Sequence, residues 1–147
     1  MQHSHSVPIE CWRAKAGAEV ARSLGLETGA PIIIVRRLLK FNDEPIVVDE
    51  IYLPGELFPD LNIEILRSAD KSLYSLFETR YGVHMIRAEE RIGAVAADRM
   101  SAELLQVEEG SPLLSVERVT YTYANRPVEW RRGLYVTRNY HYVNELT

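Results

Sequence analysis

The feature of this sequence that most constrains its fold is an internal repeat. Residues 21–37 align with residues 102–118 without a gap, at an offset of 81 positions. After one inserted residue, Pro45 aligns with Pro127. Because a solenoid needs about three or more stacked repeats, two copies predict one domain with internal pseudo-twofold symmetry. Seven of the 17 aligned positions are identical: Ala21, Leu24, Glu27, Gly29, Pro31, Val35 and Arg37 match Ala102, Leu105, Glu108, Gly110, Pro112, Val116 and Arg118.

Each copy of the repeat has the pattern of a helix, a tight turn and a β-hairpin. In the first copy, Gly29 permits a turn with positive φ, and Pro31 begins an extended segment. Two apolar stretches, residues 31–41 and 45–53, flank a polar turn at residues 42–44 and predict the hairpin. We expect the two hairpins of the repeat to join one antiparallel sheet.

The remaining segments add strands and helices to these hairpins. The patterns predict a strand over residues 7–15, a helix over residues 16–24 ended by Gly25, a short helix near residues 63–66 within a long connection over residues 55–69, a helix after Asp70 or Ser72 ended by Gly82, and an extended segment over residues 83–96. Residues 1–6 are polar and predict a linker or disordered tail, which leaves residues 7–147 for the domain. The expected fold class is α+β, an antiparallel sheet with flanking helices.

Length and composition favour one soluble globular domain. The chain has 147 residues, of which 46% are hydrophobic and 26% charged, the balance of an ordinary globular protein. Its single cysteine, Cys11, cannot form an internal disulfide, which favours a reducing, cytoplasmic location. No apolar run approaches the roughly 18 residues that span a bilayer, so we expect no membrane partner.

Charge and motifs argue against several function classes. The formal net charge of −4 gives the chain no overall attraction to a nucleic-acid backbone. The sequence lacks a Walker loop, GxGxxG, GxSxG and HExxH, so we expect neither a cofactor nor a metal, and the case for an enzyme is weak. His84 and His141 lie beside apolar or aromatic residues without an acid or nucleophile at a telling spacing, which favours structural roles.

The two arginines of the repeat are candidate ligand contacts. Arg37 and Arg118 occupy equivalent positions on the first strand of each hairpin, within apolar sequence. An arginine that points into a cleft can bind a carboxylate or a phosphate through two parallel hydrogen bonds. The alternative is a solvated face of the strand, and the alternation of side chains alone does not choose between the two.

Two carboxylates on the second strands are further candidates. Asp49 follows Pro45, and Glu129 follows Pro127, each among Val, Ile or Trp. Such carboxylates suit hydroxyl and ammonium groups of a ligand. The alternative is a surface position, or an ion pair with a nearby arginine, which at a surface contributes only about 0–1 kcal/mol. The arginines within reach are Arg131 and Arg132.

The start of the helix at Ser72 is a candidate anion site. Ser72 and Tyr74 lie where free backbone N–H groups and the helix dipole favour an anion. The alternative is that Ser72 caps the helix and Tyr74 packs at its edge, and both can hold together. An aromatic group near the C-terminus suggests a face for stacking or for a dimer contact: Tyr121, Tyr123, Trp130, Tyr135, Tyr140 and Tyr142.

In combination these features resemble the UTRA domain, the effector-binding half of HutC-type regulators in the bacterial GntR family. The resemblance covers almost the whole chain and rests on an ordered series of motifs. They are Leu-x-Leu-x-x-Gly-x-Pro at residues 24–31, Asn-Asp-Glu-Pro at 42–45, Tyr-Leu-Pro at 52–54, Ser-Leu-Tyr at 72–74, Tyr-Gly at 81–82, Ile-Arg-Ala-Glu at 86–89, Gly-x-Pro-Leu-Leu at 110–114 and Pro-Val-Glu at 127–129.

The resemblance implies a fold related to chorismate lyase, a homodimer, and a winged helix-turn-helix domain that binds operator DNA and that this sequence does not contain. It also implies that Arg37, Ser72 and Tyr74 hold an anion, and that Asp49, Glu129 and Tyr135 contact the rest of the effector.

The sequence departs from the family pattern at three places. Leu39 stands where members that bind phosphosugars often carry a second arginine, Asp49 stands for a glutamate, and Arg138-Asn139 replaces Asp-Arg. A carboxylate or a differently shaped anion is therefore as compatible with the sequence as a phosphosugar.

The leading hypothesis is the effector-sensing, dimerising domain of a transcription regulator, in which a small anionic metabolite changes DNA affinity by linkage. Two alternatives stay open. One is a chorismate-lyase-like enzyme on the same fold. The other is a purely structural dimerisation module, whose cleft would be filled by side chains.

Overall fold

The computed structural model describes residues 4–140 and residue 143. In chain order the elements are β1 (Ser4–Lys15), α1 (Ala18–Leu24), β2 (Pro31–Phe41), β3 (Glu44–Pro54), the 3-10 turn η1 (Gly55–Leu57), α2 (Ile63–Ser68), α3 (Leu73–Tyr81), β4 (Arg87–Ala96), α4 (Arg99–Leu105), β5 (Pro112–Tyr121), the 3-10 turn η2 (Tyr123–Asn125) and β6 (Pro127–Tyr135). No helix among the described residues is long and apolar enough to cross a membrane.

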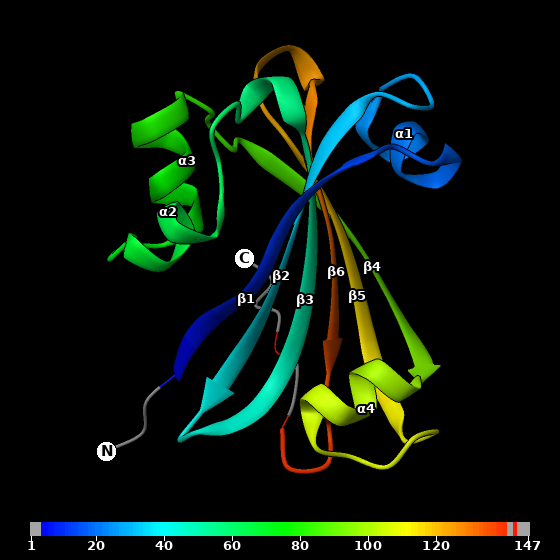
Figure 1. The fold of residues 1–147 in the computed structure, drawn as a ribbon. Helices are drawn as coiled ribbons and strands as arrows, with labels where there is room; N and C mark the ends of the chain where they lie inside the picture. The colour runs from blue at the N-terminus through cyan, green and yellow to red at the C-terminus, as the bar shows by residue number, and fades with distance from the viewer. Residues whose placement is uncertain (1–3, 141–142, 144–147) are drawn as a thin grey trace.

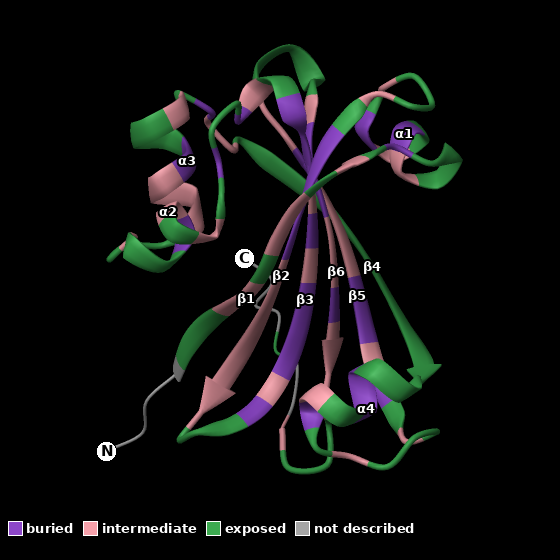
Figure 2. Ribbon diagram, viewed as in Figure 1, coloured by how far each residue is buried: buried purple, intermediate pink, exposed green. Residues whose placement is uncertain are grey.

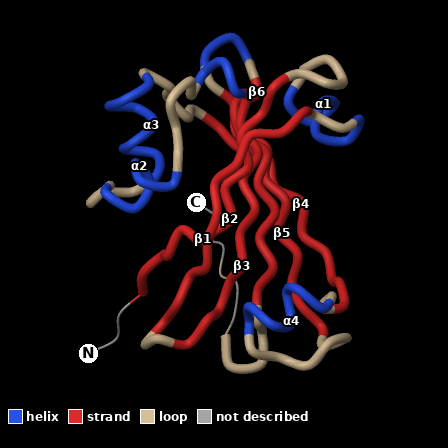
Figure 3. Tube along the Cα trace, in the orientation of Figure 1, coloured by secondary structure: helices blue, strands red, loops and turns tan. Residues whose placement is uncertain are grey.

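The strands form one twisted sheet in the order β1-β2-β3-β6-β5-β4, and every neighbouring pair is antiparallel (Figures 1 and 3). The two hairpins of the repeat, β2-β3 and β5-β6, lie side by side and meet through β3 and β6. The structure therefore confirms the predicted α+β class, the single antiparallel sheet and the pairing of the two copies within it.

The repeat also locates the pseudo-twofold axis. Pro45 and Pro127 set an offset of 82 positions for the second strands, which makes Glu50 the equivalent of Arg132. These two residues are direct partners in the β3–β6 register, and Arg132 Nη2 lies 3.3 Å from Glu50 Oε1. The axis thus passes between two side chains of opposite charge at the centre of the sheet.

Helices cover both faces of the sheet. α2 and α3 lie on one face and α1 and α4 on the other, as Figure 1 shows. Phe58 and Phe77 pack with Ile33 and Ile51 under α2 and α3, while Trp130 packs in a cluster with the residues of α1. Figure 2 shows the resulting buried stripe along the central strands. Side-chain alternation along each strand separates the two cores.

The N-terminal segment differs from its prediction. Ser4 to Ser6 belong to β1, paired with Phe41, Lys40 and Leu39 of β2, so a tail over residues 1–6 is wrong for these three residues. The long strand β2 extends to Phe41 and offers backbone partners along that whole length. Residues 1–3 lie outside the described residues.

The N-terminus of α4 provides a test of one local interaction. Asp98 is its N-cap, and Asp98 Oδ1 accepts a hydrogen bond from the backbone N–H of Ser101 at 2.8 Å. This hydrogen bond lowers the pKa of Asp98 below its usual value. A carboxyl whose folded pKa is depressed stabilises the fold above its unfolded pKa, and this contribution is lost as the pH falls through the folded pKa.

We therefore expect Asp98→Ala to lower the free energy of unfolding by about 1 kcal/mol at neutral pH. Asp98→Asn keeps an acceptor at the N-cap and should retain most of this stability. Urea denaturation at neutral pH compares the three proteins, and the difference between wild type and Asp98→Ala should shrink in acid. A loss as large for Asn as for Ala at neutral pH would contradict the capping role.

Candidate functional site

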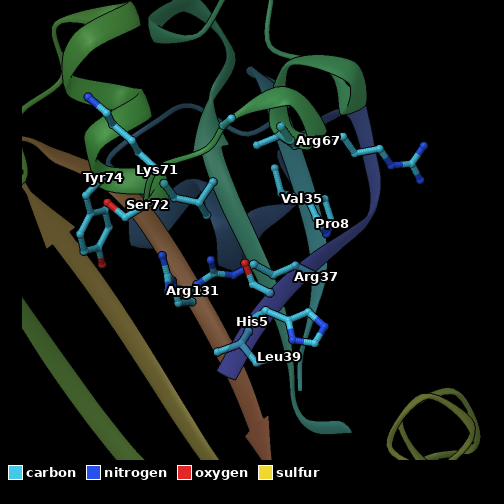
Figure 4. A pocket seen from close by; sticks show the side chains of 14 residues that line it. His5, Pro8, Val35, Arg37, Leu39, Arg67, Lys71, Ser72, Tyr74 and Arg131 are labelled. Carbon is cyan, nitrogen blue, oxygen red and sulfur yellow. The ribbon is translucent and has the colours of Figure 1, made fainter. Parts of the chain in front are cut away.

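A cavity of about 410 Å³ lies between the sheet and the segment that leads from α2 into α3 (Figure 4). β1 and β2 form one wall, β6 contributes to the floor, and residues 66–74 form the other wall. The side chains that line the cavity are of three kinds: cationic (Arg37, Arg67, Lys71 and Arg131), apolar (Pro8, Val35, Leu39, Leu66, Ala69 and Leu73) and polar (His5, Ser6, Ser72 and Tyr74). This size and this mixture of walls are typical of small-molecule sites.

Arg37 reaches the cavity from β2. It is the strand partner of Asp49 on β3, and its Nε donates a hydrogen bond to Asp49 Oδ2 at 2.9 Å. Both side chains are nearly buried, with exposed fractions of 14% and 4%. Among the described residues, no hydrogen-bond acceptor contacts its terminal Nη1 and Nη2 atoms, so both remain as donors for a ligand. Burial and the charge of Arg131 lower the pKa of Arg37 despite Asp49, so an added anion would stabilise its charge.

Arg131 connects the two buried carboxylates beneath the cavity. Its Nη2 donates a hydrogen bond to Glu129 Oε2 at 2.8 Å, and its Nη1 lies 3.6 Å from Asp49 Oδ2. Its guanidinium also lies against the ring of Tyr74, 5.5 Å from the ring centroid. The nearby carboxylates raise the pKa of Arg131 against the opposing effect of its burial. Arg131 is therefore held as a cation in the cavity floor.

Glu129 is completely buried and does not occupy a surface position. Its Oε1 accepts hydrogen bonds from Thr120 Oγ1 at 2.8 Å and from the hydroxyl of Tyr74 at 3.4 Å. With Arg131 on Oε2, both of its oxygens have partners. The ion pair that the sequence offered as an alternative is present, but in the interior.

The N-terminus of α3 supplies the opposite wall of the cavity. Ser72 is the N-cap, and its Oγ accepts a hydrogen bond from the backbone N–H of Ser75 at 3.2 Å. The hydroxyl of Tyr74 accepts a hydrogen bond from Arg118 Nη1 at 2.7 Å. Ser72 and Tyr74 both line the cavity, so capping and a place at the site hold together.

The equivalent arginine of the second copy has a different environment. Arg118 donates to Glu90 Oε2 from Nε at 3.1 Å and from Nη2 at 2.9 Å, in addition to its bond to Tyr74. It is absent from the residues that line the cavity. Tyr74 and Glu90 thus accept the hydrogen bonds of Arg118, whereas Arg37 keeps its terminal nitrogens as donors for a ligand. The first copy of the repeat therefore supplies the arginine that is open to a ligand, while the second copy contributes Arg131 to the cavity floor.

The six predicted site residues divide into three groups. Arg37, Ser72 and Tyr74 line the cavity, while Asp49 and Glu129 lie behind the arginines that do. Tyr135 is the strand partner of Val47 and is not one of the lining residues. Burial, and after it the charge of Asp49, raises the pKa of Tyr135. Its contact with an effector stays a prediction.

Sequence reasoning missed Arg131 and Lys71 as lining residues. Arg131 follows Glu129 by two positions, so strand alternation already placed both side chains on one face.

The aromatic group did not form a single face, because Trp130 packs with Tyr52 on the side of α1, opposite Tyr135. Among the described residues, no three His, Cys, Asp or Glu side chains are grouped so as to hold a metal ion. His141 and Tyr142 lie outside the described residues.

Helices on both faces of an antiparallel sheet, with a cavity lined in part by arginines and a lysine, define a domain suited to hold a small ligand. Comparison with known proteins identifies the family. The model of the UTRA domain matches residues 2–141, and the chain belongs to the UTRA domain family.

Its relatives are transcription regulators of the GntR family. The chain is 31% identical over 115 residues to the HTH-type transcriptional regulator Rv0792c of Mycobacterium tuberculosis, which covers 78% of this chain and 42% of that protein. It is 27% identical over 132 residues to the HTH-type transcriptional repressor NagR of Bacillus subtilis, which covers 88% of this chain and 53% of that protein. The chain thus spans about half the length of these relatives.

A solved structure shares the fold closely. The ligand-binding domain of a GntR-family transcriptional regulator from Bordetella bronchiseptica superposes with a TM-score of 0.94 at 48% identity, over 98% of this chain and 92% of that one. This likeness confirms the α+β fold and the assignment to the effector-binding type of domain.

Proposed function

We propose that this domain senses a small anionic metabolite, bound in the cavity beneath α3, and thereby modulates DNA binding by a winged helix-turn-helix domain. The observation that carries the proposal is Arg37, a nearly buried arginine whose Nε is held by Asp49 while its terminal nitrogens face the cavity. A guanidinium fixed in this way is preorganised for a carboxylate or a phosphate.

The wider assignment rests on the family. We infer that the full protein is a HutC-type regulator that acts as a homodimer in the cytoplasm and contacts operator DNA through a domain outside this chain. Relatives named as HTH-type regulators support this inference. Effector binding changes DNA affinity only if the effector has different affinities for the two states of the dimer, a coupling typically worth about 1–3 kcal/mol.

Two rival functions have less support. A purely structural module predicts a cleft filled by side chains, whereas a cavity of about 410 Å³ is open between β2 and α3. An enzyme of the chorismate-lyase type predicts pyruvate release from chorismate, and we expect none. The carboxylates nearest the cavity, Asp49 and Glu129, are engaged with Arg37 and Arg131.

Binding by wild type and Arg37→Ala tests the proposal. With a panel of anionic metabolites, we expect at least one to raise the melting temperature of the wild type, and Arg37→Ala to weaken its binding by about 10- to 100-fold in calorimetry. Arg126→Ala, which removes an arginine from an exposed ion pair with Glu56, is the matched control and should bind normally. Equal binding by wild type and Arg37→Ala would exclude this cavity as the site.

A further inference from the structure

The charges of the cavity floor are already balanced inside the protein. Arg37 pairs with Asp49 at 2.9 Å, and Arg131 pairs with Glu129 at 2.8 Å. Asp49 and Glu129 are 4% and 0% exposed, so solvent screens their charge only weakly. The floor thus presents N–H donors toward a ligand but carries no net positive charge.

The remaining cations lie at the margin of the cavity. Lys71 and Arg67 are exposed, and Figure 4 shows both side chains extending away from Arg37 and Arg131. Charges in such positions are solvated and screened, and each interacts weakly with a group on the floor. They attract an anion toward the cavity without compensating a charge that is buried in it.

These positions set a limit on the charge of a ligand. One negative charge at the Nη atoms of Arg37 receives strong hydrogen bonds and leaves the floor, with its two carboxylates, at a net charge of −1. A doubly charged group would leave it at −2, with Asp49 directly across the same guanidinium. Repulsion from buried carboxylates grows with the charge of the ligand, and burial of uncompensated charge is costly.

An apolar patch surrounds Arg37 in the cavity wall, and the polar lining residues besides the arginines and Lys71 are His5, Ser6, Ser72 and Tyr74. Val35 and Leu39 of β2 flank Arg37 on the same face of the strand, and Leu66 and Leu73 stand opposite on the α2–α3 segment. Burial of hydrocarbon against these side chains would contribute roughly 25 cal/mol per Å² of apolar surface. Hydroxyl groups of a ligand that lay against these four side chains would have no partners, and polar groups that are buried unpaired are destabilising.

We propose that the effector is a monocarboxylate with a compact apolar body, whose carboxylate binds the Nη atoms of Arg37 and whose body packs on Val35, Leu39 and Leu66. This assignment rests on the proposed function of the cavity and narrows its ligand class. Ser72 and Tyr74 complete the polar end of the site.

Matched probes that differ only in the head group test which ligand charge the cavity prefers. Benzoate carries one negative charge, benzamide has the same shape without charge, and phenyl phosphate is doubly charged at pH 7.5. Calorimetry with the whole chain is expected to give benzoate a Kd at least about tenfold below that of either counterpart. The same order is expected for 3-phenylpropionate and its amide. Arg37→Ala should abolish the preference of benzoate over benzamide.

A variant that adds a positive charge to the cavity should reverse the preference for a singly charged ligand. Leu39 lies on the same face as Arg37, so Leu39→Arg adds one cation that no buried carboxylate balances. We expect it to shift the preference at least about tenfold toward phenyl phosphate. Leu39→Met, which keeps the site apolar, is the control and should leave the order of the probes unchanged.

The outcomes separate this inference from the proposed function. Tighter binding of phenyl phosphate or benzamide than of benzoate to the wild type, with loss in Arg37→Ala, overturns the monocarboxylate and leaves the sensor function intact. If no carboxylate probe binds while a polyhydroxylated or phosphorylated metabolite of the wider panel does, the ligand class is again wrong. Absence of binding by every probe and every metabolite overturns both proposals.

Discussion

Glu129→Ala is expected to lower the free energy of unfolding by about 3–5 kcal/mol, the usual result of removing one partner from a buried ion pair. Glu129 is 0% exposed, and the alanine would leave the guanidinium of Arg131 with Asp49 alone, at 3.6 Å. Thr120 Oγ1 and the hydroxyl of Tyr74 would lose their shared acceptor as well. Urea denaturation followed by circular dichroism measures the midpoint and the slope.

An exposed ion pair provides the control for this prediction. Glu56→Ala removes a carboxylate 71% exposed from its contact with Arg126, and we expect a change of about 0–1 kcal/mol. The double variant Glu129→Leu/Arg131→Met replaces both charges with apolar groups and should recover much of the stability lost by Glu129→Ala. A cost below about 1 kcal/mol for Glu129→Ala would show that the interior does not depend on this pair.

The sequence predicted the helices, strands and turns of this molecule well because these elements depend on local signals. Gly29 and Gly110 adopt the expected positive φ of 90°, and each precedes a strand that begins at a proline two residues later. Ser72 caps α3, and Gly82 ends it with a left-handed conformation, as the helix signals indicated. These features depend on a few neighbouring residues and on steric rules that hold in any fold.

The site was harder to predict because it depends on contacts between distant segments. Tyr74 contacts Glu129, which is 55 positions away, only because α3 covers the face of the sheet toward which Glu129 of β6 points. Strand alternation placed Arg37 on the same face as Val35, yet no local signal indicated that an open cavity, and not solvent, would lie above it. The repeat singled out Arg37 and Arg118 as candidates, of which Arg37 lines the cavity and Arg118 does not. At an offset of 82 positions, Asp49 corresponds to Arg131.

That exchange of charge explains why the two halves differ. In the first copy the partner of Arg37 on the neighbouring strand is Asp49, whereas in the second the partner of Arg118 is Arg131. Two facing arginines need acceptors from elsewhere, and the carboxylates of Glu129 and Glu90 and the neutral hydroxyl of Tyr74 fulfil that need. A carboxylate at one equivalent position and an arginine at the other thus leaves Arg37 open to a ligand and closes the site at Arg118.

Gly133→Ala is expected to damage both stability and the proposed binding site. A Cβ at this position of β6 would lie 2.9 Å from Asp49 Oδ1 and 2.9 Å from Tyr135 Cε1. Asp49 has little room to move, because it holds Arg37 at 2.9 Å and lies 3.6 Å from Arg131. Overpacking of this kind typically costs about 1–3 kcal/mol. We also expect a shift of Arg37 that weakens carboxylate binding about tenfold or more, because each 1.4 kcal/mol of lost interaction is a factor of about ten in affinity.

Two further measurements test whether Asp49 causes the effect of Gly133→Ala: a control substitution at Gly93, another glycine in a strand, and a double-mutant cycle with Asp49. Gly93→Ala on β4 adds a methyl group where no atom lies within 4 Å, and should change stability by no more than about 0.5 kcal/mol. If Asp49 is the obstacle at Gly133, the cost of Gly133→Ala should fall by about 1 kcal/mol in an Asp49→Ala background. Additive effects of the two substitutions, measured by urea denaturation, would instead place the strain at Tyr135, and carboxylate binding should then survive Gly133→Ala because Arg37 keeps its partner.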